Sequence, residues 1–191
     1  MSAGPLRIAV VAGKFPAVSE TFVSRQVIEL RRLGHSVDVY ASRLGRVPDG
    51  AGAEIAELAR QVRVRPERGI GGLGRAARVL TKPGLAARLL NAGRYGKDAS
   101  SLRLLFAAEP WLGQGSYDAV LAHFAPNANV VAKLRDAGAL GGGLVAFFHG
   151  SDIAGAKAGE LDVLFKHGDR FVAVSEDLAS RAVVLGARAN V

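Results

Sequence analysis

The sequence contains no cysteine, one tryptophan and one methionine, and aromatic residues make up only 6% of its 191 residues. The absence of cysteine excludes disulfide bonds and thiolate metal sites. The N-terminus has no apolar run long enough for a signal-peptide core or a membrane-spanning helix, so we expect a cytoplasmic protein. Hydrophobic residues make up 49% of the chain, which predicts one globular domain over residues 1–191.

Several sequence patterns of known chemistry are also missing. The chain has no Walker loop, no Gly-x-Ser-x-Gly elbow and no His-Glu-x-x-His, and no two aspartates stand two residues apart. We therefore expect no metal ion and no cofactor. Residues 69–74 match the dinucleotide-binding pattern of glycines, but no acidic residue follows at the end of a second strand. We interpret them as a flexible segment that leads into basic helices.

The net charge of +8 is concentrated in residues 60–103. This segment has eleven Lys and Arg residues against only Glu67 and Asp98, so its net charge is +9 and the rest of the chain carries −1. A basic excess confined to one segment needs a local explanation.

Two interpretations of this segment remain open. The apolar spacing predicts amphipathic helices at 71–80 and 85–92, which would turn Arg75, Arg78 and Arg88 toward an anionic membrane surface. Alternatively, the basic residues form a solvated face while apolar residues pack on a sheet. The residues available for such packing are Val79, Leu80, Leu89 and Leu90.

Apolar strand patterns alternate with helical patterns along the chain. The expected strands are 6–11, 37–41, 62–64, 117–124, 144–148 and 171–175. The other expected helices are 21–33, 53–59, 102–108, 127–136, 160–166 and 176–185. This alternation predicts an α/β fold, a Rossmann-like parallel sheet with helices on both faces.

Polar residues follow four of these strands. Because ligands of open α/β sheets bind at the carboxyl ends of the strands, we expect a binding site there. The four groups are Gly13 with Lys14, His123, residues 149–152 and residues 175–177.

Each of these groups also has a purely structural interpretation. Gly13 either opens a phosphate-binding loop before the next helix or makes a tight turn, and Glu20 argues against phosphate. His149 either bonds a sugar hydroxyl or developing charge, or it bonds nearby backbone while Ser151 or Asp152 caps a helix. His123 has the same two interpretations, and Ser175 is expected to cap a helix.

Five motifs in one order resemble a known family. They are FPAVSETFV at 15–23, LGHSVDVYA at 33–41, AHFAPN at 122–127, FFHGSD at 147–152 and FVAVSEDL at 171–178. Together they resemble the N-terminal domain of glycosyltransferase family 4, of the type found in bacterial exopolysaccharide and colanic-acid synthesis.

The resemblance implies a GT-B fold, in which two Rossmann-like domains face each other across a cleft. The N-terminal domain binds the acceptor and the C-terminal domain binds a nucleotide-sugar. Transfer to a saccharide or lipid-linked acceptor is metal-independent and retains anomeric configuration. We expect this chain to be the N-terminal half without the donor-binding domain, and inactive by itself.

The resemblance also implies roles for individual residues. His149 corresponds to the catalytic histidine beside the transferred sugar. The expected donor-binding residues are Gly13, Lys14, Ser151 and Asp152. The expected acceptor-binding residues are Ser19, Glu20, Thr21, His123 and Asn127.

Two other functions are kept as alternatives. In the first, the chain is a non-catalytic binding subunit that pairs with a separate donor-binding chain. In the second, it is a nucleic-acid-binding domain, an alternative that the pI of 10.4 suggests. The basic segment has only Tyr95 nearby for base stacking, and no nucleic-acid-binding motif is present, so we expect no nucleic acid partner. The expected partners are a nucleotide-sugar, an acceptor and the inner face of an anionic membrane.

Overall fold

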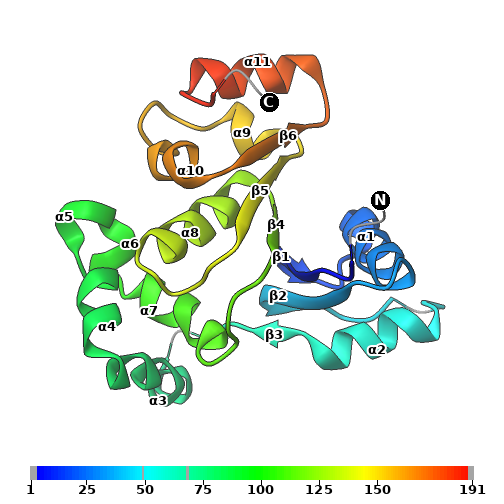
Figure 1. Ribbon diagram of the computed structural model, residues 1–191, viewed down its shortest axis with the longest axis horizontal. Helices are drawn as coiled ribbons and strands as arrows, with labels where there is room; N and C mark the ends of the chain where they lie inside the picture. The colour runs from blue at the N-terminus through cyan, green and yellow to red at the C-terminus, as the bar shows by residue number, and fades with distance from the viewer. Residues whose placement is uncertain (1–3, 49, 68, 189–191) are drawn as a thin grey trace.

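The computed structural model describes residues 4–48, 50–67 and 69–188, so Arg68 of the basic segment lies outside it. Six parallel strands form one sheet in the order β3-β2-β1-β4-β5-β6 (Figure 1). The strands are β1 (Arg7–Phe15), β2 (Ser36–Leu44), β3 (Arg63–Val64), β4 (Ala119–His123), β5 (Gly143–Phe148) and β6 (Arg170–Ala173). This arrangement confirms the predicted Rossmann-like fold.

Helices fill the connections between the strands. The longer helices are α1 (Thr21–Arg32), α2 (Ala53–Gln61), α3 (Ile70–Ala77), α4 (Pro83–Leu89), α8 (Ala125–Asp136) and α11 (Glu176–Val184). The short ones are α5 (Ala92–Tyr95), α6 (Lys97–Ser100), α7 (Arg103–Ala108), α9 (Ser151–Ala154), α10 (Asp162–His167), and the 3₁₀ turns η1 (Val18–Glu20), η2 (Arg78–Thr81) and η3 (Glu109–Trp111). Within the described residues, no helix is long and apolar enough to cross a membrane.

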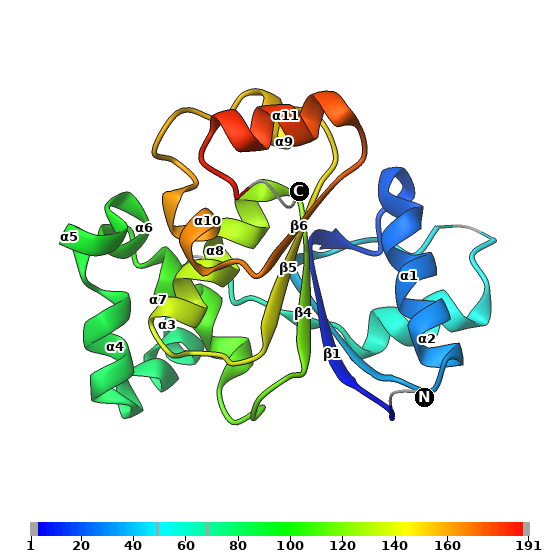
Figure 2. The ribbon, with the colours of Figure 1, turned by 45° about the horizontal axis from the view of Figure 1, so that its top comes forward.

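The alternation of side chains along β1 divides the core into two layers. Ile8, Val10 and Ala12 belong to the cluster that α1 and α2 cover, whereas Ala9 and Val11 face the larger cluster. Figure 2 shows α1 and α2 on one side of the sheet and α3 to α8 on the other. Both faces of the central strand are thus buried, which is why its sequence is continuously apolar.

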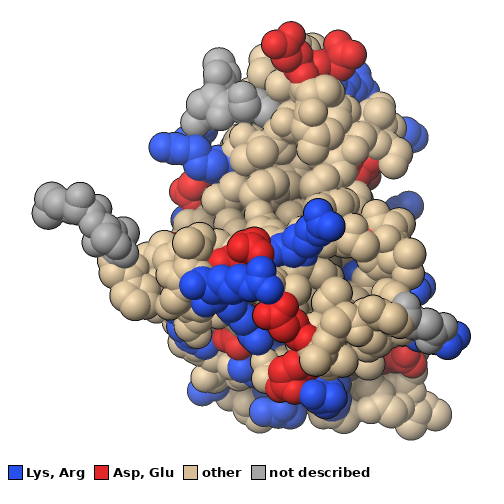
Figure 3. All heavy atoms as spheres, turned by 90° about the vertical axis from the view of Figure 1, so that its right-hand side faces the viewer, with Lys and Arg blue, Asp and Glu red and all other residues tan. Residues whose placement is uncertain are grey.

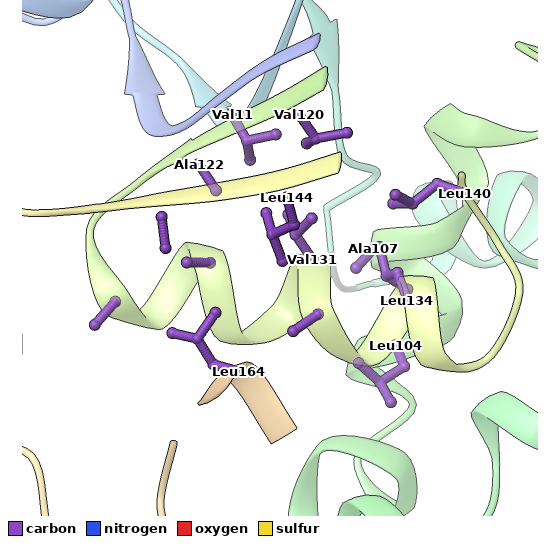
Figure 4. Close-up of a cluster of buried hydrophobic side chains, with 14 of the residues drawn as sticks. Val11, Leu104, Ala107, Val120, Ala122, Val131, Leu134, Leu140, Leu144 and Leu164 are labelled. Atoms are coloured by element: carbon purple, nitrogen blue, oxygen red, sulfur yellow. The ribbon is translucent and has the colours of Figure 1, made fainter. Parts of the chain in front are cut away.

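The larger cluster lies between the sheet and α8 (Figure 4). Val120 and Leu144 of the sheet are buried against Val131 and Leu134 of α8. Leu104 of α7 belongs to the same cluster, so the helices of the basic segment share the core of the domain.

The first strand is longer than the sequence pattern predicts, and the expected loop at Gly13 and Lys14 is wrong. Both residues lie within β1, and Lys14 pairs with Arg43 of β2. The reason is that β2 itself runs on to Leu44 and supplies backbone partners past Gly13. Gly13 therefore opens neither a phosphate loop nor a tight turn.

The prediction that residues 69–74 form a flexible segment is wrong. Most of them belong to α3. Gly72 has no room for a side chain, since an added Cβ would meet the Glu67 carbonyl oxygen and the Phe106 ring. Gly72 therefore allows close packing of α3, a structural role that needs no nucleotide.

Arginines of the basic segment donate hydrogen bonds to carboxylate and carbonyl oxygens of residues outside the segment. Arg75 and Arg78 donate to the carboxylate of Glu109, at 2.7 and 2.9 Å, and the Glu109 side chain is only 2% exposed. Arg88 donates to the Ala137 carbonyl oxygen, and Arg94 donates to Asp136. The three arginines expected to face a membrane therefore all have intramolecular partners.

The apolar residues of the segment divide between packing and exposure. Val79 and Leu89 are buried, as the packing interpretation requires, but Leu80 and Leu90 are exposed. Packing thus explains half of these four apolar residues, and membrane contact stays a prediction.

On the face with α1 and α2, oppositely charged side chains lie together (Figure 3), as in the Arg32–Glu29 and Arg32–Glu54 pairs.

Candidate functional site

The strand order reverses between β1 and β4. The chain leaves β1 for β2 on one side, and β4 lies on the other side, with Val11 beside Ala122. In sheets of this order, ligands bind outside the carboxyl ends of the strands where the order reverses. His123 is the last residue of β4, and it therefore lies at this position.

His123 and His149 are in direct contact. The Nδ1 atom of His123 lies 3.1 Å from Nε2 of His149, and its Nε2 atom lies 2.8 Å from Oε1 of Gln26. His123 is only 2% exposed, whereas His149, directly after β5, is half-buried. The buried histidine thus connects α1 to the histidine that solvent and a ligand can reach.

Burial favours the neutral form of both imidazoles. Burial, with a smaller contribution from His149, lowers the pKa of His123 to about 4. Burial also lowers the pKa of His149, although the nearby Asp152 opposes this shift. A neutral imidazole has one N–H group, so the bonds of His123 determine those of His149.

The Gln26 contact therefore sets the tautomers of both rings. Because Oε1 of Gln26 accepts a hydrogen bond, His123 carries its proton on Nε2 and accepts at Nδ1. His149 then donates through Nε2, and its Nδ1 atom is the hydrogen-bond acceptor that remains for a ligand.

Phenylalanine rings surround the histidine pair. The rings of Phe22 and Phe124 each lie 4.6 Å from the His149 ring, measured between centroids, and Phe147 stacks on His123 at 4.8 Å. Phe124 has a φ of 68°, in the left-handed region that few non-glycine residues occupy. This backbone conformation ends β4 abruptly and begins α8, which brings the Phe124 ring against His149.

Asp152 organises the backbone of the site. Its carboxylate accepts from the amide of Ala125 at 2.8 Å, and from the amides of His149 and Gly150 at 3.1 and 2.8 Å. This confirms the capping interpretation of Asp152, and the helix that it caps is α8. Ser151 is exposed at the start of α9, and a donor-binding role for either residue stays a prediction.

Asn127, in the first turn of α8, lies directly beside Gly13 of β1. Nδ2 of Asn127 donates to the carbonyl oxygen of His123 at 2.9 Å. An added Cβ on Gly13 would lie 3.5 Å from the same Nδ2 atom. Although Gly13 lies within a strand, it therefore remains beside the residues that the sequence placed in one site.

Glu20 carries an unpaired oxygen at the start of α1. Its Oε2 atom is buried and has no hydrogen-bond partner in the described part of the chain. Burial raises the pKa of Glu20, and the charge of Lys14 opposes that shift. Ser19, Thr21 and Lys14 are exposed, so Glu20 lies among surface residues.

The remaining strand end behaves as expected. The Ser175 hydroxyl accepts from the amide of Leu178 at 3.4 Å, so Ser175 caps α11. Among the described residues, no group of three or more His, Asp or Glu side chains could hold a metal ion.

Four residues of the site were missed by sequence reasoning, namely Phe22, Gln26, Phe124 and Phe147. Gln26 lies in α1 between the buried Val23 and Val27, and Phe22 precedes Val23 in the same helix. The only available signal was a glutamine near the buried face of a helix, where a polar group needs a partner.

The six parallel strands with helices on both faces define a Rossmann-like domain, and comparisons with known proteins give the family. The family model described as Glycosyltransferase Family 4 matches residues 19–191, and the chain belongs to this family. This confirms the resemblance read from the sequence motifs.

The curated relatives include colanic acid biosynthesis glycosyltransferases named WcaL. The chain is 31% identical over 195 residues to that of Salmonella typhimurium and 29% identical over 191 residues to that of Escherichia coli. Each match covers 91% of this chain and 46% of the relative, so the chain spans about half the length of these relatives.

A solved structure of the lipopolysaccharide outer core galactosyltransferase WaaB, in its apo form, has the same fold. The TM-score is 0.61 at 13% sequence identity, and the match covers 96% of this chain and 43% of that one. At this identity, the likeness supports the fold alone.

Proposed function

We propose that this chain is the acceptor-binding part of a retaining, metal-independent glycosyltransferase. The complete enzyme moves a sugar from a nucleotide-sugar to a saccharide or lipid-linked acceptor, and it uses no cofactor. The observation that carries this proposal is the pair of neutral histidines at the carboxyl end of β4 and β5, in a chain that belongs to glycosyltransferase family 4.

His149 is the catalytic residue in this proposal. Its half-buried ring is held by Phe22 and Phe124, so a ligand can approach it from one direction. The free Nδ1 atom accepts a hydrogen bond from a hydroxyl of the transferred sugar. Such a fixed contact beside the reacting carbon contributes to catalysis through orientation.

Other residues near the carboxyl ends of the strands bind the acceptor and the nucleotide-sugar donor. The unpaired carboxylate oxygen of Glu20 accepts a hydrogen bond from an acceptor hydroxyl, next to Ser19 and Thr21. Gly13 lacks a side chain, which lets a donor pyrophosphate approach the strand, and Lys14 supplies a positive charge. Ser151 is the exposed donor-side hydroxyl.

The location follows from the acceptor. We place the reaction in the cytoplasm, with the basic segment against the inner face of the membrane. Ile70, Leu73 and Leu80 of this segment are exposed apolar residues beside Arg75 and Arg78, a combination typical of membrane-surface helices.

Calorimetry with nucleotide-sugars tests whether this chain alone binds the donor. This chain is compared with a chain extended to the full length of the relatives, using UDP- and GDP-sugars. We expect this chain alone to bind each of them with a Kd well above about 1 μM, the equivalent of about −8 kcal/mol. Sub-micromolar binding by this chain alone would show that the donor site is already complete here, and the proposal would fail.

A further inference from the structure

A pocket lies near the histidine site, on the face of the sheet that α7 and α8 cover. Val11, Tyr40 and Trp111 form its buried floor. Arg63, Arg65 and Arg103 line the same pocket, and each is half-buried. The three arginines come from β3, the residue that follows it and the first turn of α7, so only the folded chain brings them together.

Asn127 connects the pocket to the histidine site. This residue lines the pocket, and its side chain also donates to the carbonyl oxygen of His123. A molecule with one end in the pocket can therefore extend along the carboxyl edge of the sheet toward His149.

Positive charge dominates the pocket. Among the described residues, no Asp or Glu lines it. Arg63 and Arg103 each pair with a carboxylate that is also shared by a second cation. Asp38 lies 3.3 Å from Arg7 and 3.4 Å from Arg63, and Asp98 lies 2.9 Å from Arg103 and 2.6 Å from Lys133.

Arg63 also has an unused hydrogen-bond donor. Its Nε atom is buried and has no partner in the part of the chain that the structure describes. Because a buried N–H group without a partner is costly, this atom is a donor available to a hydrogen-bond acceptor from outside the chain.

We propose that this pocket binds an oxyanion of the acceptor, either a carboxylate or a phosphate group on a sugar. The inference rests on the proposed function, because it assigns the pocket to the acceptor of the same reaction. Arginine keeps its charge at any physiological pH and presents paired N–H groups that match the geometry of carboxylates and phosphates. The apolar floor strengthens this attraction by excluding water from beneath the bound group.

Trp111, the single tryptophan of the chain, lines the pocket, so its fluorescence can report binding there. Its fluorescence is followed while pyrophosphate, glucuronate or glucose is added to this chain. We expect a saturable change with the two anions and none with neutral glucose, and the tighter of the two anions identifies the group that the acceptor carries. Arg63→Gln and Arg65→Gln, tested separately, should each weaken binding about tenfold, as expected for a hydrogen bond to a charged group.

Arg60→Gln is the matched control. It removes the same charge from the same segment, but its side chain is 70% exposed and pairs with Glu57 on its own helix, outside the pocket. Circular dichroism melting establishes that each variant is folded. The proposal is overturned if no anion binds, if glucose binds equally well, or if Arg60→Gln weakens binding as much as both pocket variants do.

The pocket and the transfer function can fail separately. Anion binding without any transfer by a full-length chain would leave the pocket in place and remove the proposed function. If the full-length chain uses neutral and anionic forms of an acceptor with the same kcat/KM, the proposed function is supported. The proposal that the pocket binds an anionic group of the acceptor then fails.

Discussion

The imidazole of His123 bonds to His149 on one side, at 3.1 Å, and to Gln26 on the other, at 2.8 Å. The half-buried His149 is thus held by the buried His123, and His123 by a side chain of α1. A change in Gln26 or His123 therefore reaches the ligand-facing atom of His149 without touching a ligand.

Replacement of His149 tests its catalytic role. In a chain of the relatives' full length, His149→Ala should lower kcat by about 10²–10³, the usual cost of removing one well-placed polar group at a reacting centre. Its half-buried side chain leaves the fold intact. His35→Ala is the control, because His35 lies at the opposite end of the strands, where it accepts from the Leu6 amide. Turnover by the His149 variant within a few-fold of the parent would make His149 a structural residue.

The buried His123 should make stability depend on pH. Its pKa is about 4 in the folded chain and about 6.5 when unfolded, so between these values the unfolded chain binds more protons. Stability is therefore complete above pH 6.5 and is lost as the pH falls. The loss should be about 2 kcal/mol between pH 7 and pH 5.

Urea denaturation at pH 5, 6 and 7 measures this dependence. His123→Gln should be less stable at pH 7, but it should lack most of the decline toward pH 5. An equally steep decline in the variant would show that other groups, and not His123, cause it.

The Glu109 carboxylate should make Arg75 and Arg78 important for stability. Changing both arginines to Gln leaves a buried charge without a partner, which should cost about 3 kcal/mol. Adding Glu109→Gln to this variant should recover most of that loss, because the buried charge is then gone. Denaturation midpoints of the double and triple variants decide this, and equal midpoints would show that the ion pairs contribute little.

Membrane contact must be tested without disturbing these ion pairs. Ile70 is 92% exposed, and Leu73 and Leu80 are exposed beside it, so changing all three to Gln should not affect the fold. We expect the parent chain to sediment with anionic vesicles, less so at high salt, and the triple variant to stay in solution. Leu33→Gln with Val184→Gln is the control, since both residues are exposed outside the basic segment. Equal sedimentation of parent and triple variant would rule out this segment as the membrane contact.

The amino-acid sequence by itself determined the order and type of the elements. Apolar runs of strand length alternate with helical patterns, and this local periodicity depends only on neighbouring residues. It also located His123 and His149, because a polar residue directly after a buried strand must lie at the carboxyl edge of a parallel sheet. The capping role of Ser175 was equally local, since its partner is three residues away.

Only the tertiary structure decided the length of β1 and the partners of buried polar groups. β1 continues through Gly13 because β2 runs beside it, which no feature of the β1 sequence shows. Gln26 and His123 are 97 residues apart, and Glu109 is more than 30 residues from Arg75 and Arg78. Hydrogen bonds and ion pairs act over a few ångströms in space and not along the chain, so these partners were set by the packing of helices on the sheet.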